Sequence, residues 1–139
     1  MKPTRLKDYA EKNLYTKKRR YCDESIICII RLNDNKHIDI QVKTVRENTG
    51  YVFVTKDTWK NNLRDNLYLA LVLFENHKMP TIYFIPSTAW LTPNDLFRDR
   101  LYDKEGQKSK PEWGINISSK NMELLKQYDV TKFIALTKA

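Results

Sequence analysis

The sequence predicts an α/β domain in which a mixed β-sheet is flanked by helices. Short apolar runs rich in β-branched residues indicate strands, and apolar residues between them recur at helical spacing. The chain has 139 residues, of which 41% are hydrophobic, so it fits one domain with a substantial core.

A helix is expected first. Leu6, Tyr9, Ala10 and Leu14 recur at helical spacing, and Pro3 suits a helix start. We therefore expect an amphipathic helix over residues 4–16, followed by the basic run KKRR at residues 17–20.

A β-hairpin is expected over residues 25–44. Residues 25–32 (SIICIIRL) are too apolar for a surface helix, and the NDNK that follows is typical of a turn. The next segment, HIDIQVKTV (residues 37–45), alternates strictly, which predicts a half-buried strand. Its polar side chains would form one line, and that line is either a solvated face or a reaction site.

Further strands are expected at residues 51–55, 67–74 and 81–87. Trp59, Leu63 and Leu67 repeat every fourth residue, which predicts a helix over residues 57–66. Residues 88–112 suggest irregular structure. Ser118 or Ser119 can cap a helix that runs to about Tyr128, and the last ten residues stay open.

The net charge of +8 is concentrated near the N-terminus. Residues 1–20 contain eight basic side chains and only Asp8 and Glu11 as acidic ones, so they hold +6 of it. This favours a polyanionic partner such as nucleic acid, contacted by Lys17, Lys18, Arg19 and Arg20. The alternative is a basic segment that only improves solubility.

A second basic group would lie on the predicted helix at residues 57–66. Lys56, Lys60 and Arg64 recur every fourth residue and would form an exposed ridge that contacts backbone phosphates, or an ordinary solvated face. Trp90 and Trp113 would stack on bases or, as we expect, pack in the core.

Composition also bears on localisation. No apolar run has the length of a membrane span, and the first residues lack the apolar segment of a secretion signal. Cys22 and Cys28 have no metal-ligand spacing, and Cys28 lies in an apolar run. We expect no membrane association and a cytoplasmic protein.

The spacing of Gln41 and Lys43 suits phosphodiester hydrolysis. Residues two apart on a strand face the same side, so both groups reach one point. A hard cation such as Mg²⁺ binds carboxylate and amide oxygens and activates water, and a lysine stabilises the developing negative charge.

Residues 23–44 (DESIICIIRLNDNKHIDIQVKT) resemble the core of the PD-(D/E)xK nuclease superfamily. In that family an Asp opens one strand of a hairpin, and Glu-x-Lys or Gln-x-Lys lies on the next. Gln41 and Lys43 match the second half of this motif. Asp23 is the expected carboxylate, with Glu24 as a competing assignment and Asp39 as a third carboxylate on the same strand face as Gln41.

The resemblance extends over about residues 23–128. The ordered segments LYLALVLF, IYFIPSTAW and SKPEWGINISSKNMELLKQY are similar to a bacterial branch of the superfamily with a Q-x-K motif and a PEWGIN tail. The resemblance implies a restriction-endonuclease-like core at 23–128 within a single domain 1–139, preceded by a basic N-terminal helix and arm at 1–22. It also implies a metal bound by Asp23, Gln41 and Asp39, and a catalytic group of Asp23, Gln41 and Lys43.

The expected activity is that of a nuclease dependent on Mg²⁺ or Mn²⁺. Its substrate is DNA or RNA, with DNA favoured. The alternative is a nuclease-like module with degraded chemistry that binds nucleic acid or a protein partner. A third interpretation is a small interaction subunit of a larger bacterial system.

Overall fold

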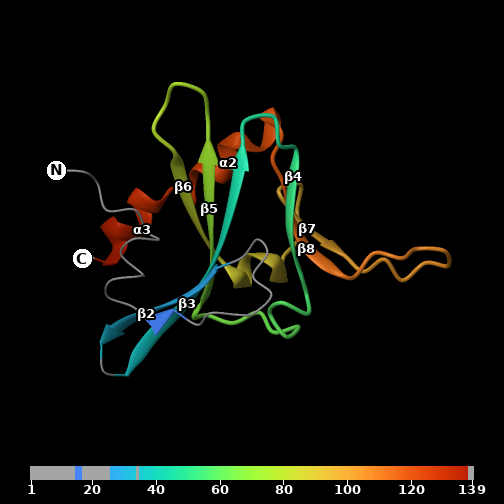
Figure 1. Ribbon diagram of the computed structural model, residues 1–139, viewed down its shortest axis with the longest axis horizontal. Helices are drawn as coiled ribbons and strands as arrows, with labels where there is room; N and C mark the ends of the chain where they lie inside the picture. The colour runs from blue at the N-terminus through green and yellow to red at the C-terminus, as the bar shows by residue number, and fades with distance from the viewer. Residues whose placement is uncertain (1–14, 17–25, 34, 138–139) are drawn as a thin grey trace.

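The computed structural model describes residues 15–16, 26–33 and 35–137, and it arranges them in two β-sheets and short helices (Figure 1). The larger sheet, sheet A, has the strand order β1-β2-β3-β5-β6. Its strands are β1 (Tyr15–Thr16), β2 (Ile26–Asn33), β3 (Lys36–Arg46), β5 (Leu67–Phe74) and β6 (Thr81–Pro86).

The smaller sheet, sheet B, has the order β4-β8-β7 and is antiparallel. It consists of β4 (Tyr51–Thr55), β8 (Glu112–Asn116) and β7 (Phe97–Arg100). Neither β7 nor β8 was expected from the sequence, which suggested irregular structure over residues 88–112. Strand β8 pairs with β4, which joins residues about 60 positions apart, as in Val54↔Trp113, and β7 pairs with β8.

The expected hairpin is confirmed. Strands β2 and β3 pair antiparallel, with Ile26 beside Val42 and Ile30 beside Ile38. Strand β3 also pairs in parallel with β5, and β5 pairs antiparallel with β6, so sheet A is mixed. The coarse prediction of an α/β fold with a mixed sheet is therefore confirmed.

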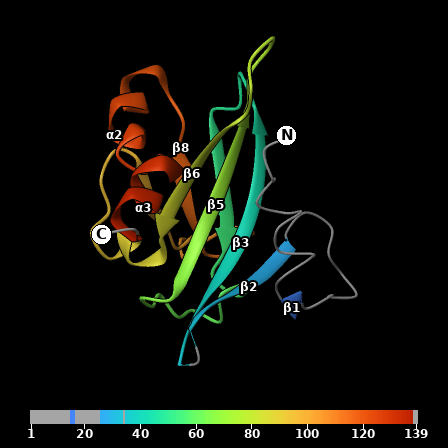
Figure 2. The same cartoon turned by 90° about the vertical axis from the view of Figure 1, so that its left-hand side faces the viewer.

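Sheet A lies between helix α3 (Val130–Thr137) and sheet B (Figures 1 and 2). Its face toward α3 buries a small cluster consisting of Cys28, Ile38, Ile40, Ala70 and Phe84, with Phe133 packed against it. The burial of Cys28 confirms that it is a core residue.

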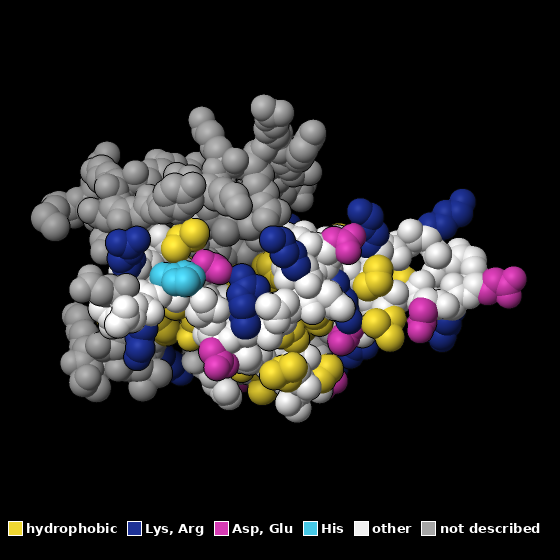
Figure 3. Space-filling model, turned by 90° about the horizontal axis from the view of Figure 1, so that it is seen from below, with side chains coloured by type: hydrophobic (Ala, Val, Ile, Leu, Met, Phe, Trp, Pro, Cys, Tyr) yellow, Lys and Arg dark blue, Asp and Glu magenta, His cyan; other side chains and the backbone are white. Residues whose placement is uncertain are grey.

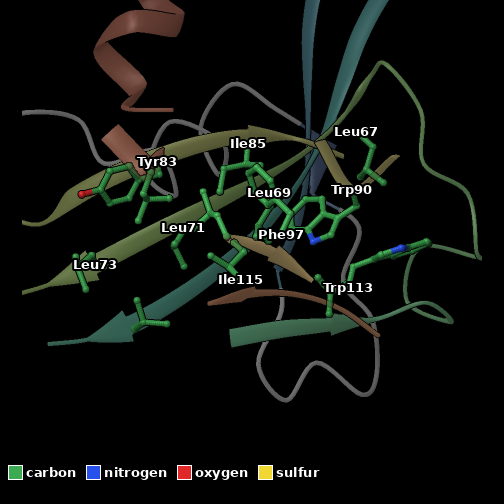
Figure 4. Close-up of a cluster of buried hydrophobic side chains, with 14 of the residues drawn as sticks. Leu67, Leu69, Leu71, Leu73, Tyr83, Ile85, Trp90, Phe97, Trp113 and Ile115 are labelled. Atoms are coloured by element: carbon green, nitrogen blue, oxygen red, sulfur yellow. The ribbon is translucent and has the colours of Figure 1, made fainter. Parts of the chain in front are cut away.

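The other face of sheet A forms the main core against sheet B. Figure 4 shows Leu69 and Leu71 of β5 on the side of the sheet where Phe97, Trp113 and Ile115 lie. The leucines of β5 line this face at every second residue, whereas Ala70 lies in the cluster on the opposite face, as the strand period of two requires. The residues of this face are buried because sheet B packs on them.

The helices are short. They are the 3-10 turns η1 (Ser87–Leu91) and η2 (Ser119–Asn121) and the helices α2 (Met122–Lys126) and α3. The helical segment expected after Ser118 is present, because η2 leads directly into α2, which ends at Lys126. Ser118 is the N-cap residue, but its side chain makes no capping hydrogen bond.

The helix predicted over residues 57–66 is wrong. Residues 56–61 form turns, and Lys60 and Asn61 have φ of 53° and 52°, which a right-handed helix excludes. Trp59 and Leu67 are nevertheless buried in the main core, with Leu63 packed against it. The spacing of four residues between them arises because a loop places one side chain in the core at intervals, and it does not arise from a helix.

The helix predicted over residues 4–16 falls mostly outside the described residues. Its last two positions, Tyr15 and Thr16, form β1 and pair with Ile29 and Cys28, so the prediction is wrong there. Lys17, Lys18, Arg19, Arg20, Asp23 and Glu24 also lie outside the described residues. In the part of the chain that the structure describes, no helix is long and apolar enough to cross a membrane.

Candidate functional site between the two sheets

The polar line on β3 lies on the side of sheet A that faces sheet B. Asp39, Gln41 and Lys43 are register partners of Leu67, Leu69 and Leu71, three leucines of the main core. The expectation that the three polar residues share one face is therefore confirmed. The solvated-face interpretation fails for the middle residue, because Gln41 is 0% exposed.

Gln41 is an unusual core residue. Neither its Oε1 nor its Nε2 has a hydrogen-bond partner among the described residues. A buried polar group left without a partner costs about 1–3 kcal/mol, and most such groups in native proteins are satisfied by protein, water or an ion. The amide is therefore an unsatisfied donor and acceptor pair enclosed in the core.

Lys43 is the next residue on the same face and is half-buried. No ion pair joins its ammonium group to the residues that the structure describes. The polar line thus places a half-buried cation two residues from an unpartnered amide, on the same face of β3.

Asp39 has a different partner. Its Oδ2 lies 2.8 Å from Nη2 of Arg64, and its Oδ1 lies 3.8 Å from Nε2 of His37. The hydroxyl of Ser87 accepts a hydrogen bond from the Arg64 backbone N–H and donates one to the Arg64 carbonyl, at 2.9 and 2.7 Å. Ser87 thus holds the backbone of Arg64 in position. The Arg64 guanidinium group pairs with the Asp39 carboxylate, which was considered as a third metal ligand.

The remaining carboxylates of the expected site, Asp23 and Glu24, lie outside the described residues. The register Ile26↔Val42 brings the start of β2 beside the position of Lys43 on β3. Within residues 15–16, 26–33 and 35–137, no group of three or more His, Cys, Asp or Glu side chains is placed to hold a metal ion. From the described chain, the Gln41 amide oxygen is the ligand that the motif would supply.

The basic ridge expected from Lys56, Lys60 and Arg64 does not form. Lys56 Nζ lies 2.6 Å from Asp99 Oδ1 and 5.0 Å from the centre of the Trp113 ring, and Arg64 pairs with Asp39. Lys60 is exposed, but the chain at this point is a turn. Seen from below, the surface of the described residues carries basic and acidic side chains interspersed, with no continuous basic ridge (Figure 3).

The two tryptophans considered for base stacking are core residues. Trp90 is 1% and Trp113 4% exposed, and Trp90 Nε1 donates to the Gly114 carbonyl at 2.9 Å. Trp59 packs against both rings at centroid distances of 5.7 Å. The core-packing alternative is confirmed.

Sequence reasoning missed a group on the side of sheet B that points away from the main core. Tyr51 Oη donates to Glu112 Oε2 at 2.6 Å, and the Arg100 guanidinium lies 4.2 Å from the centre of the Tyr51 ring. Burial and this hydrogen bond raise the pKa of Tyr51, so the hydroxyl keeps its proton. The sequence predicted a strand at residues 51–55, but nothing local indicated that Glu112 and Arg100 lie beside Tyr51.

Comparisons with models of protein families, with curated proteins and with solved structures found no match to this chain. The geometry of the described residues and the sequence motif therefore carry the functional argument.

Proposed function

We propose that the protein acts on nucleic acid and hydrolyses phosphodiester bonds with the help of a divalent cation held at Gln41. The single observation that carries this proposal is the fully buried Gln41 amide, which has no hydrogen-bond partner among the described residues. A native fold rarely keeps such a group unless a ligand, water or ion completes it.

The residues present fit a hard cation in part. The Gln41 Oε1 is an amide oxygen, a ligand type that Mg²⁺ and Mn²⁺ accept, and Asp23 or Glu24 would add a carboxylate. Bound there, the cation would polarise the phosphoryl oxygen and lower the pKa of a water molecule. One carboxylate and one neutral amide leave its charge under-neutralised, so we expect weak metal binding.

Lys43 has two roles in this proposal. Its ammonium group binds a non-bridging oxygen of the scissile phosphate, and it stabilises the negative charge that grows as the new P–O bond forms. Its partial burial strengthens both interactions, because charges interact more strongly away from bulk water.

Cleavage of labelled single- and double-stranded DNA and RNA with Mg²⁺ or Mn²⁺ tests the proposal. Lys43→Ala should abolish cleavage and leave binding nearly intact, since the lysine acts mainly on the transition state. Lys36→Ala is the matched control, because Lys36 lies on the same strand but is exposed at the hairpin turn. Absence of cleavage by the unaltered protein under all these conditions would refute the nuclease proposal.

The second candidate is a nuclease-like module that binds nucleic acid without cutting it. The pairing of Asp39 with Arg64 favours it, because that pairing removes one of three candidate carboxylates from the site. Binding that weakens with salt, together with no cleavage in Mn²⁺, would support this candidate, since phosphate contacts release counterions.

A further inference from the structure

The outer face of sheet B carries aromatic and arginine side chains. Val52, Val54, Phe97, Trp113 and Ile115 point into the main core, so the alternate residues of the three strands point away from it. We call this surface the outer face. Its members are Tyr51, Phe53 and Thr55 of β4, Glu112, Gly114 and Asn116 of β8, and Arg98 and Arg100 of β7.

The aromatic part of the outer face is fixed in place. Gly114 lies between Phe53 and Arg98, and a Cβ at this position would overlap the Tyr51 ring and hydroxyl. Glycine therefore allows Tyr51 to lie across β8 and reach Glu112. Phe53 stacks beside Tyr51 at a centroid distance of 6.1 Å and stays 44% exposed.

The exposed charge of the outer face is positive. Arg98 and Arg100 are both exposed, whereas Glu112 is 4% exposed and accepts the Tyr51 hydroxyl. Asp99 points to the opposite side, where it pairs with Lys56. The face therefore presents two guanidinium groups and an open phenyl ring in a chain with a net charge of +8.

We propose that the outer face of sheet B binds single-stranded nucleic acid, with a base stacked on Phe53 and backbone phosphates on Arg98 and Arg100. Aromatic rings stack on any base, and guanidinium groups bind phosphate with two parallel hydrogen bonds or stack on a base in turn. The inference rests on the proposed function for its ligand class, although it does not require cleavage.

A single strand fits this face better than a duplex. Stacking needs a base face that is free, and the bases of a duplex already stack on one another. Three strands span only roughly 10 Å, so the face is a narrow platform. Tyr51 is already covered by Arg100, so Phe53 is the ring with an available face.

The test is fluorescence anisotropy with the full chain in EDTA, which removes metal-dependent cleavage. The probes are a labelled twelve-nucleotide thymidine strand, an abasic strand of equal length and a duplex. The unaltered protein should bind the thymidine strand about tenfold more tightly than the abasic strand, because stacking supplies that difference. Phe53→Ala should bind both equally weakly, and Arg98→Ala should weaken both.

Phe74→Ala is the matched control for the ring, because Phe74 is 45% exposed on sheet A. Arg31→Ala, an exposed arginine on β2, is the control for charge. Phe53→Leu keeps an apolar cover over the sheet and removes only the ring, so it guards against a folding defect. Binding without cleavage in Mn²⁺ would refute the proposed nuclease activity, but it would not contradict single-strand binding at the outer face.

Equal affinity for the thymidine and abasic strands would overturn the inference. Tighter binding to the duplex that is insensitive to Phe53→Ala would overturn it too. Equal losses of affinity in Phe53→Ala and Phe74→Ala would also overturn the inference, because the outer face would then contribute no more to binding than sheet A does. In that case a protein partner becomes the occupant to examine.

Discussion

The guanidinium group of Arg64 lies 2.8 Å from the carboxylate of Asp39, at one end of the polar line that continues to Gln41 and Lys43. The polar residues of β3 therefore differ in whether they have a partner. Asp39 is neutralised by a neighbour held in place by Ser87, whereas Gln41 and Lys43 have no such partner among the described residues. Any carboxylate that serves Lys43 therefore has to come from another part of the chain.

Arg64→Ala should lower the free energy of unfolding by about 1 kcal/mol, because it leaves a mostly buried Asp39 carboxylate without its partner. Urea denaturation measures this change. Lys60→Ala, in the same loop, should have little effect because Lys60 is exposed. Adding Asp39→Asn to Arg64→Ala should recover part of the loss, and full additivity of the two changes would show that the pair does not interact.

Trp59→Ala should cost about 3–5 kcal/mol of stability, as a large truncation in the core. Trp59 is 3% exposed and packs between Trp90 and Trp113. Trp59→Phe should cost much less, because the indole N–H donates to no described residue and its loss breaks no hydrogen bond. Urea denaturation distinguishes them, and equal losses for the two variants would contradict this account.

The parts of the fold that the sequence predicted are those whose signal is local. Strands β4 and β5 occur at the expected residues, since YVFVT and LYLALVLF are β-branched or apolar throughout. Strand β7 (FRDR) contains one apolar residue, and β8 (EWGIN) contains a glycine. Their strand character comes from the pairing of β8 with distant β4 and of β7 with β8, which no local pattern encodes.

The site was predicted in part for the same reason. Alternation placed Asp39, Gln41 and Lys43 on one side of β3, and the structure confirms it. Alternation does not tell which side a second sheet covers, so the complete burial of Gln41 was not foreseen. The partner of Asp39 was also hidden, because the expected helix at residues 57–66 aimed Arg64 at solvent.

Tyr51 should make the protein less stable at alkaline pH. Its pKa is raised in the folded state by burial and by the bond to Glu112, whereas in the unfolded chain it has the ordinary value of 10.0. Below that pH both states are protonated and the contribution is complete. Above it the unfolded state loses the proton first, so stability falls as pH rises.

Thermal unfolding between pH 8 and 11 measures this effect. Tyr51→Phe should show a shallower fall above pH 10 than the unaltered protein, and Phe74→Leu should follow the unaltered protein. Tyr68 and Tyr83 also have pKa values raised by burial, so some fall should remain in Tyr51→Phe. Identical slopes for Tyr51→Phe and the unaltered protein would show that Tyr51 does not titrate differently on folding.

Gln41→Leu should stabilise the metal-free protein by about 1 kcal/mol, because it replaces an unpartnered buried amide with an apolar side chain of similar size. When a cation is present, the unaltered protein should instead be the more stable of the two. Mn²⁺ should raise the melting temperature of the unaltered protein, since a ligand that binds only the folded state stabilises it. Gln41→Leu should lose this gain, and Gln41→Glu should enlarge it while lowering stability in EDTA, where the buried carboxylate stands alone.

Ser118→Ala is the matched control for this comparison. The Ser118 hydroxyl is also buried without a partner among the described residues, but it lies outside the polar line of β3. Its removal should change stability equally with and without Mn²⁺. If Gln41→Leu instead destabilises the metal-free protein, or responds to Mn²⁺ as the unaltered protein does, the amide is satisfied within the fold and the proposed metal ligand is lost.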